Sequence, residues 1–484
     1  MADTSPPEAE TSSEAGAPRT PEQTQGTWAT IKEALSGTHH DYTEGSLRRA
    51  IFLLAVPMVL ETLLESVFAV VDVLVVGRLG PDAIATVGLT EAILTILYAV
   101  AMGLSIGATA MVARRIGEKD PNQAARTAVQ AVGLGVLLGL PISAAGAIYS
   151  RPLLELMGAS PWVLEHGVRY TQVMMMGMTS VLLLFLINAI FRGAGDAAIA
   201  MRVLWLANAI NIILAPCLVF GWGPFPKMGV LGAAVATTFG RSVGVVYQLY
   251  WLARGSGHLR VRWEHVGLEP RTMLTMLRLS GLGMLQAFVA TSSWVLLARI
   301  VSSFGSVAIA GYTIAMRILL FALLPSWGLG NAAATLVGQS LGAKKPERGE
   351  QAVWTAARYN VIFLGTVGLI FIITAGPIIG IFTDDAETAS LGAKCLRIVS
   401  AGFIFYAFGM VLEQAFNGAG DTTTPTLINF GCFWVLELPL AWLLANPLGF
   451  GPFGAFSAIT VSYGVLAAVS VWLFRRGRWK LRTV

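Results

Sequence analysis

Charged residues are scarce in this chain. Only 13% of its 484 residues are Asp, Glu, Lys or Arg, whereas 55% are hydrophobic. An average soluble protein carries roughly 25% charged residues. So few charges cannot cover a soluble surface, which excludes most cytosolic enzymes and nucleic-acid-binding proteins. The composition instead indicates a polytopic membrane protein with no room for a large soluble domain.

Metal-binding and redox motifs are also missing. The three cysteines, Cys217, Cys395 and Cys432, are widely spaced and form no CxxC pair, and the five histidines show no HExxH or other metal-ligand spacing. We expect the cysteines to be small buried hydrophobic residues. We therefore expect no cofactor, no resident metal centre and no nucleic-acid partner.

Long apolar runs recur regularly after the first 47 residues. A transmembrane helix needs about 20 apolar residues, and the pattern predicts twelve of them in an all-α polytopic membrane protein. The predicted helices cover residues 50–77, 85–114, 122–149, 163–191, 198–222, 229–253, 271–302, 308–340, 351–381, 386–416, 423–446 and 453–475.

The positive charges indicate how these spans are oriented. With the N-terminus inside, 22 of the 33 Lys and Arg residues fall in the predicted inner segments and six in the outer segments, and five lie in the distal tail or within spans. Cytoplasmic loops carry the excess of positive charge. We therefore expect a plasma (inner) membrane protein with both termini in the cytoplasm, whose net charge of +5 faces the inner leaflet.

An internal repeat divides the chain into two halves. Phe191-Arg-Gly-Ala-Gly-Asp196 returns 225 residues later as Phe416-Asn-Gly-Ala-Gly-Asp421, and the register holds without a gap back to Gly80 and Gly305. Each copy contains six helices, so the halves should be related by an axis along the membrane normal. The predicted organisation is a disordered cytoplasmic tail (1–47, with a short interfacial helix near 28–35), an N-lobe (48–253), a cytoplasmic linker (254–270), a C-lobe (271–476) and a cytoplasmic tail (477–484).

Three acids in the first predicted helix stand out, because ionisable groups within a membrane are costly and usually functional. At 100° per residue, Glu61, Glu65 and Asp72 lie on one narrow face. We expect this face to line a water-filled cavity, where the acids take up protons, bind Na⁺ or attract a cationic substrate. The alternative is that Arg241, in the sixth helix, neutralises Glu61 or Glu65. Pro57, one turn before Glu61, should kink the helix.

Other polar residues lie inside the predicted spans. Asn211 in the fifth helix and Thr237 in the sixth could complete an ion site, or they could form ordinary hydrogen bonds between helices. The C-terminal half offers a possible polar network, in which Arg317 could pair with Glu413 or Glu437. That network consists of Gln286, Arg317, Glu413 and Glu437.

Several segments together resemble the multidrug and toxic compound extrusion (MATE) family. They are VVDVLVVGRLG around Asp72, GATAMVARRIGEKDP, the repeated FRGAGD and FNGAGD, and AAATLVGQSLGAKKP, and the resemblance runs from about residue 45 to 476. It implies two six-helix bundles around a V-shaped central cleft. It also implies an antiporter that exchanges organic cations for Na⁺ or H⁺.

The family's functional residues carry over in part. The resemblance implies an N-lobe cation site at Asp72, Asn211 and Thr237, and a bending proline at Pro57. The acid that the family places in the fifth helix is missing, and the seventh helix offers Gln286 where another branch has an acid. We infer that Glu61 and Glu65 supply the missing charge, which favours protons over Na⁺ as the coupling ion.

The sequence thus predicts a monomeric secondary antiporter that exports organic cations or other drugs across the membrane by alternating access of the two lobes. It is not expected to be an enzyme. The alternative is a flippase for lipid-linked precursors, but this would need a strongly cationic cavity, whereas the first helix is acidic. An intramembrane enzyme is less favoured still, because no nucleophile–base pair or metal set is present.

Overall fold

The computed structural model describes residues 27–37, 40–255 and 258–483, and every regular element within them is a helix. The first helix, α1 (Thr27–Ser36), lies in the segment predicted as a disordered tail, most of which (1–26 and 38–39) is outside the described residues. The described parts of this segment, residues 27–37 and 40–46, do not form a free tail. Ala34 and Tyr42 are buried against the helices that follow, and Arg49 pairs with Glu33 at 2.7 Å, so packing holds this segment in place.

The N-terminal half forms one bundle, in which the helices end within five residues of the predicted limits. Helix α4 (Pro121–Ile148) shows how the sequence starts an element: the Asp120 side chain accepts a hydrogen bond from the Gln123 amide at 2.9 Å, and Pro121 occupies the first helical position. The elements are α2 (Leu47–Gly77), α3 (Pro81–Gly117), α4 (Pro121–Ile148), α5 (Ser150–Leu156), the π-helix η1 (Val163–Gly167), α6 (Val168–Met176), α7 (Met178–Ala194), α8 (Ala197–Phe220) and α9 (Val230–Arg254).

The C-terminal half repeats this plan after a short linker. One span is bent by 54° between α13 and α14, and another contains a π-helical segment, η3. The elements are η2 (Trp263–His265), α10 (Pro270–Ser302), α11 (Ser306–Gly342), α12 (Pro346–Gly380), α13 (Ala386–Ala401), α14 (Phe403–Gly418), α15 (Thr423–Asn429), η3 (Phe430–Glu437), α16 (Leu438–Ala445), α17 (Pro452–Arg475) and η4 (Arg478–Leu481).

Most of these helices are membrane spans by length and apolarity. Within the described residues, ten helical segments are long and apolar enough to cross a membrane, and the bent pair α13–α14 makes an eleventh. The acidic helix α2, 31 residues long, is outside that set. Together with α2 these segments correspond to the twelve predicted helices.

The backbone confirms the 225-residue repeat. Gly80 and Gly305 have φ values of 101° and 105°, and Lys119 and Lys344 share a φ of 58°. A positive φ is uncommon for a residue other than glycine. Its recurrence at equivalent lysines therefore shows that the two halves follow the same path.

The two lobes meet through glycines that are related by the same repeat. A Cβ on Gly117 would lie 2.0 Å from the carbonyl oxygen of Gln339, and a Cβ on Gly342 would lie 2.2 Å from that of Arg114. These two contacts are equivalent, since each residue of one pair lies 225 positions from a residue of the other. The interface is therefore self-complementary, as in a two-fold dimer.

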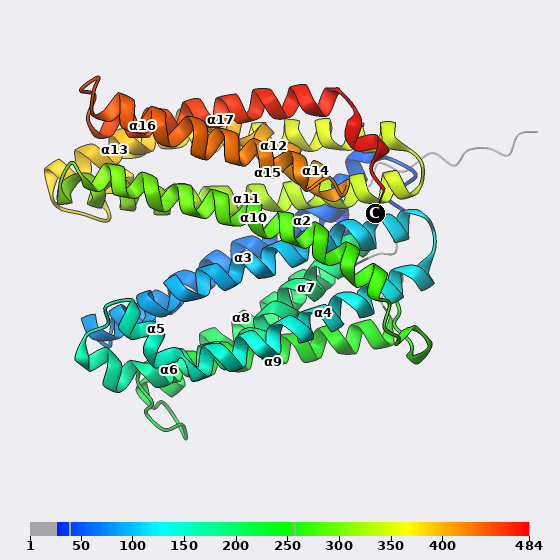
Figure 1. The fold of residues 1–484 in the computed structure, drawn as a ribbon, viewed down its shortest axis with the longest axis horizontal. Coiled ribbons are helices and arrows are strands. Elements are labelled where there is room, and N and C mark those ends of the chain that lie inside the picture. The colour runs from blue at the N-terminus through cyan, green and yellow to red at the C-terminus, as the bar shows by residue number, and fades with distance from the viewer. Residues whose placement is uncertain (1–26, 38–39, 256–257, 484) are drawn as a thin grey trace, which may run out of the picture.

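The lobes separate toward their opposite end. There the last turns of α2 pack within the N-lobe, where Val76 joins a cluster with Val219 and Val230. The first turns of α11 pack within the C-lobe, where Tyr312 joins a cluster with Phe456. Figure 1 shows the two bundles meeting at the end that holds the C-terminus and diverging toward the other. We call these the closed end and the open end.

The N-terminal loop (residues 40–46) connects both lobes at the closed end. The Tyr42 hydroxyl donates to the carbonyl oxygen of Gly195 in the N-lobe at 3.2 Å. In return, Arg348 of the C-lobe donates to the carbonyl oxygens of Tyr42, Glu44 and Gly45 at 2.7–3.0 Å. This loop therefore lies across the contact between the lobes.

Candidate functional site

The carboxylates of α2 face the other helices of the N-lobe, as their spacing predicts. Glu61 contacts α7, whereas Glu65 contacts α8 and α9. Asp72, further along the same face, interacts electrostatically with Arg241 of α9. The three acids do not share one water-filled space: Glu61 is 5% exposed, whereas the side chain of Glu65 is 32% exposed.

Arg192 neutralises Glu61. Its Nη1 donates to Glu61 Oε1 at 2.9 Å, and Asn188 Nδ2 donates to the same oxygen at 3.3 Å. The other oxygen, Oε2, is buried without a hydrogen-bond partner among the described residues. Sequence reasoning missed this pair, because the predicted helix 163–191 ended one residue before Arg192 and left that residue in an inner segment. The nearby FRGAGD repeat was the available signal, because an arginine stands where the second copy has Asn417.

Arg241 neutralises Glu65, as the alternative interpretation of the sequence held. Its Nη2 lies 3.3 Å from Glu65 Oε1, and Asn208 donates to Oε2 at 2.9 Å. Arg241 is itself buried and close to the Phe68 ring, 5.9 Å from its centroid. This contact fixes the acid of α2 to α8 and α9.

Asp72 is the one acid of the three that forms no ion pair or hydrogen bond with a described side chain. Its Oδ1 is buried and has no hydrogen-bond partner within the described part of the chain. Asn211 and Thr237, which the resemblance groups with it, bond to each other instead: Asn211 Nδ2 donates to Thr237 Oγ1 at 2.7 Å. No three His, Cys, Asp or Glu side chains of the described residues converge as metal ligands would.

Pro57 lies buried inside α2, which runs unbroken from Leu47 to Gly77. Proline has no amide hydrogen, so the helix loses one backbone bond at this point. Glu61 and its partner Arg192 follow one turn later. A point of weakened backbone hydrogen bonding therefore lies directly before the paired segment of the helix.

The C-lobe contains a contact equivalent to Glu61–Asn188, in which the acid and the amide have exchanged positions. Gln286, 225 residues after Glu61, donates to Glu413, 225 residues after Asn188. Asn429 donates to the same Glu413 oxygen at 3.1 Å. Two members of the predicted C-lobe network are thus in contact, without an arginine.

The other two members of that network lie apart. Glu437 is buried, and its Oε2 has no hydrogen-bond partner in the described residues. Arg317 is exposed on α11, and no ion pair among the described residues joins it to Glu413 or Glu437. The pairing of Arg317 with either acid is therefore wrong. Arg317 instead interacts electrostatically with Glu91 of α3, and Glu91 also interacts with Asp72. Charges of the two lobes therefore act on one another.

Family comparison is consistent with this architecture. The MatE family model matches residues 57–217 and 284–443, which are one segment in each lobe and together cover more than half of the chain. The probable multidrug resistance protein NorM of Thermotoga maritima is 27% identical over 439 residues, 90% of this chain and 94% of that protein. The multidrug resistance protein NorM of Burkholderia vietnamiensis is 28% identical over 434 residues, 87% and 92%.

Relatives with other names also match. The FAD transporter of Shewanella oneidensis is 24% identical over 416 residues, 84% of this chain and 89% of that protein. Among solved structures, MATE in complex with MaL6 superposes with a TM-score of 0.85 at 24% identity, over 91% of this chain and 98% of that one. An outward-facing multidrug resistance MATE family transporter of the MOP superfamily gives 0.84 at 25% identity, over 91% and 97%.

The repeat, the helical lobes and the family match agree with one another. The expected all-α fold and the resemblance stated from the sequence are both confirmed. This multi-pass integral membrane protein belongs to the multidrug and toxic compound extrusion (MatE) family.

Proposed function

We propose that the protein is a secondary antiporter that exports small organic cations and similar drugs in exchange for H⁺, with Na⁺ as the alternative coupling ion. It works as a monomer and needs no cofactor. Relatives that carry the multidrug resistance name support the substrate class. The acidic character of α2 favours cations over the anionic substrate that the FAD transporter's name indicates.

Asp72 is the observation that carries the proposal. Its buried oxygen Oδ1, which accepts no hydrogen bond from the described residues, lies on an otherwise apolar stretch of α2, whereas Glu61 and Glu65 are already compensated by arginines. A lone carboxylate in such surroundings gains from taking up a proton or a cation. Asp72 is therefore the site where coupling ion and substrate compete.

Exchange follows from this competition. Protonation of Asp72 removes its attraction to Arg241 and to any bound cation, so that substrate leaves the N-lobe. Because the two equilibria are linked, ion and substrate compete even without touching each other. The lobes rock against each other, so that the glycine contacts of the closed end separate when the open end closes, and Pro57 lets α2 bend during the change.

The orientation of the transporter is part of the proposal. The closed end lies in the cytoplasm, because the predicted inner segments carry most of the positive charge. The described ends of the chain both lie at this end. The structure then corresponds to a state that opens away from the cytoplasm.

Efflux from proteoliposomes under separately imposed pH and Na⁺ gradients tests the proposal. A fluorescent organic cation should be driven by the pH gradient, and Asp72→Asn should lower its rate at least about tenfold, because the site can no longer change charge. Asp82→Asn, at an exposed acid in the first turn of α3, is the matched control and should stay near wild type. Unchanged gradient-driven efflux by Asp72→Asn would disprove the role of this residue.

A further inference from the structure

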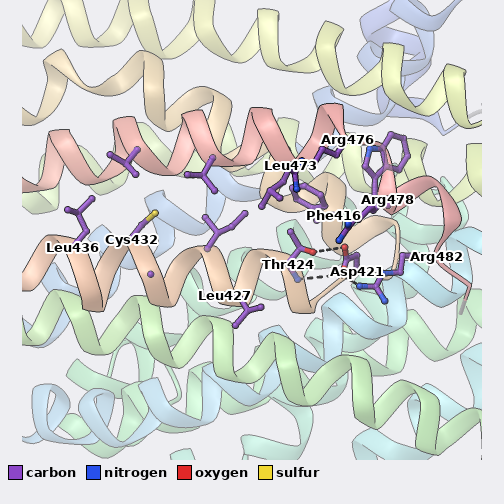
Figure 2. Close-up of a pocket in the computed structure, with 15 residues that line it drawn as sticks. Phe416, Asp421, Thr424, Leu427, Cys432, Leu436, Leu473, Arg476, Arg478 and Arg482 are labelled. Atoms are coloured by element: carbon purple, nitrogen blue, oxygen red, sulfur yellow. Dashed lines mark hydrogen bonds and ion pairs between the residues drawn. The ribbon is translucent and has the colours of Figure 1, made fainter.

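A cavity of about 540 Å³ lies in the C-lobe, between the segment α15–η3 and helix α17 (Figure 2). None of the carboxylates of α2 lines it. Its volume is typical of ligand pockets, which measure about 300–1,000 Å³. Its long walls are apolar and are formed by Leu427, Ile428 and Cys432 on one side and by Val465, Val469 and Leu473 on the other.

One end of this cavity is cationic. Arg476, Arg478 and Arg482 gather there, at the end nearer the C-terminus, together with a single acid, Asp421 (Figure 2). Asp421 is already compensated, since it accepts from Thr424 Oγ1 at 2.6 Å and from Arg482 at 2.9 Å.

Two guanidinium groups therefore remain uncompensated at the cavity mouth. Arg476 and Arg478 are exposed and form no ion pair with any described residue. The guanidinium of Arg476 stacks on Trp472, 3.6 Å from the ring centroid. Tryptophan is enriched at membrane–water interfaces, which places this end of the cavity at the depth of lipid headgroups.

The matching helices of the N-lobe, α8 and α9, pack closely at Gly240. A Cβ on Gly240 of α9 would lie 2.6 Å from the Ala207 carbonyl oxygen of α8. The capping glycines of α9 and α17, Gly229 and Gly451, share a conformation (φ 60°, ψ −138° and φ 59°, ψ −144°). In this register, Ser462 of α17 is the residue equivalent to Gly240 of α9. The C-lobe thus carries a side chain where the N-lobe has glycine, and the segment that faces α17 includes the π-helix η3.

We infer that this cavity binds one anionic phospholipid, with an acyl chain along the apolar walls and the phosphate against Arg476 and Arg478. The flank of the cavity is open to the membrane, since Leu427 is 66% exposed. Basic pockets between transmembrane helices recognise anionic headgroups. A zwitterionic lipid brings its own cation and complements two free arginines less well.

Native mass spectrometry of the purified full-length protein tests the headgroup. We expect phosphatidylglycerol to bind about 30-fold more tightly than phosphatidylcholine with the same chains, which corresponds to about 2 kcal/mol at about 1.4 kcal/mol per tenfold. The double variant Arg476→Gln/Arg478→Gln should abolish this preference. The control, Arg271→Gln/Arg278→Gln, removes two exposed arginines of α10 and should keep it.

A second pair of variants tests the acyl groove. A Cβ on Gly431, which lines the cavity, meets no atom within 4 Å, so Gly431→Leu introduces a side chain at the groove wall without a clash at its Cβ. It should weaken both lipids about tenfold, whereas Gly133→Leu, equally unobstructed on α4, should not. Should the double arginine variant fail to fold, the single change Arg478→Gln and this pair still decide the matter.

Three outcomes would overturn the inference. The first is equal binding of the two lipids by the wild type, and the second is a phosphatidylglycerol preference that survives the loss of both arginines. The third is competition by inorganic phosphate combined with no effect of Gly431→Leu, which identifies an anion site without an acyl groove. None of these readouts depends on transport, so they stay independent of the proposed antiport.

Discussion

The glycine contacts between the lobes make a quantitative prediction about the closed end. Alanine at position 117 would place its Cβ 2.0 Å from the Gln339 carbonyl oxygen, and alanine at 342 would place its own 2.2 Å from that of Arg114. Real Cβ atoms essentially never come closer than 3.0 Å to another heavy atom. In either variant, the two helices must therefore move apart by about 1 Å, because the atom that the new Cβ meets is a backbone carbonyl oxygen and not a flexible side chain.

The energy of this clash favours separation of the lobes. Overpacking of this kind costs about 1–3 kcal/mol, and the cost vanishes when the closed end opens. Gly117→Ala and Gly342→Ala should each shift the equilibrium toward opening of this end by about 5- to 150-fold. Because the two contacts are equivalent by the repeat, the two variants should act alike.

Spin labels at Gln123→Cys and Gln351→Cys, two exposed positions on α4 and α12, report the separation by pulsed electron resonance. We expect a longer distance to gain population in both glycine variants but not in Gly133→Ala, whose Cβ meets nothing within 4 Å. An unchanged distance distribution refutes the reasoning. A fall in thermal stability without a longer distance also refutes it, because local distortion would then relieve the clash.

Three further predictions concern contacts other than those of Gly117 and Gly342. Arg192→Met should lower the free energy of unfolding by about 3–5 kcal/mol in thermal or denaturant unfolding, because it leaves Glu61 buried without its cation; adding Glu61→Gln should restore part of it. Asp196, whose Oδ1 lies 3.8 Å from His258 Nδ1, raises the pKa of His258 above its usual 6.5, so this ion pair stabilises the fold fully below about pH 6.5 and its contribution is lost as the pH rises through the raised pKa. His258→Gln should remove that part of the pH dependence in unfolding experiments. Arg348→Ala removes three hydrogen bonds to the N-terminal loop, worth about 1–2 kcal/mol in all at this partly exposed site, and amide exchange of the loop should become about tenfold faster; exchange as slow as in wild type would contradict the bridging role of the loop.

Local properties of the sequence determined most of the fold. A helix in a membrane satisfies its own backbone hydrogen bonds, so apolar runs and their Pro and Gly boundaries predict the spans directly. This is why the predicted limits and the 225-residue register agree with the helices and with paired positions such as Lys119 and Lys344. The common face of the acids of α2 followed from helical periodicity alone.

Only the tertiary structure decided which charges are paired. Arg192 lies 131 residues from Glu61, and Gln286 lies 127 residues from Glu413. Such pairs depend on which helices pack together and at what rotation, and residue spacing within one helix does not specify this. The packing compensates Glu61 and Glu65 and leaves Asp72 Oδ1 without a hydrogen-bond partner in the described part of the chain. A scarcity of charge is thus visible in the sequence, but the contacts between helices decide which of those charges remain free to act.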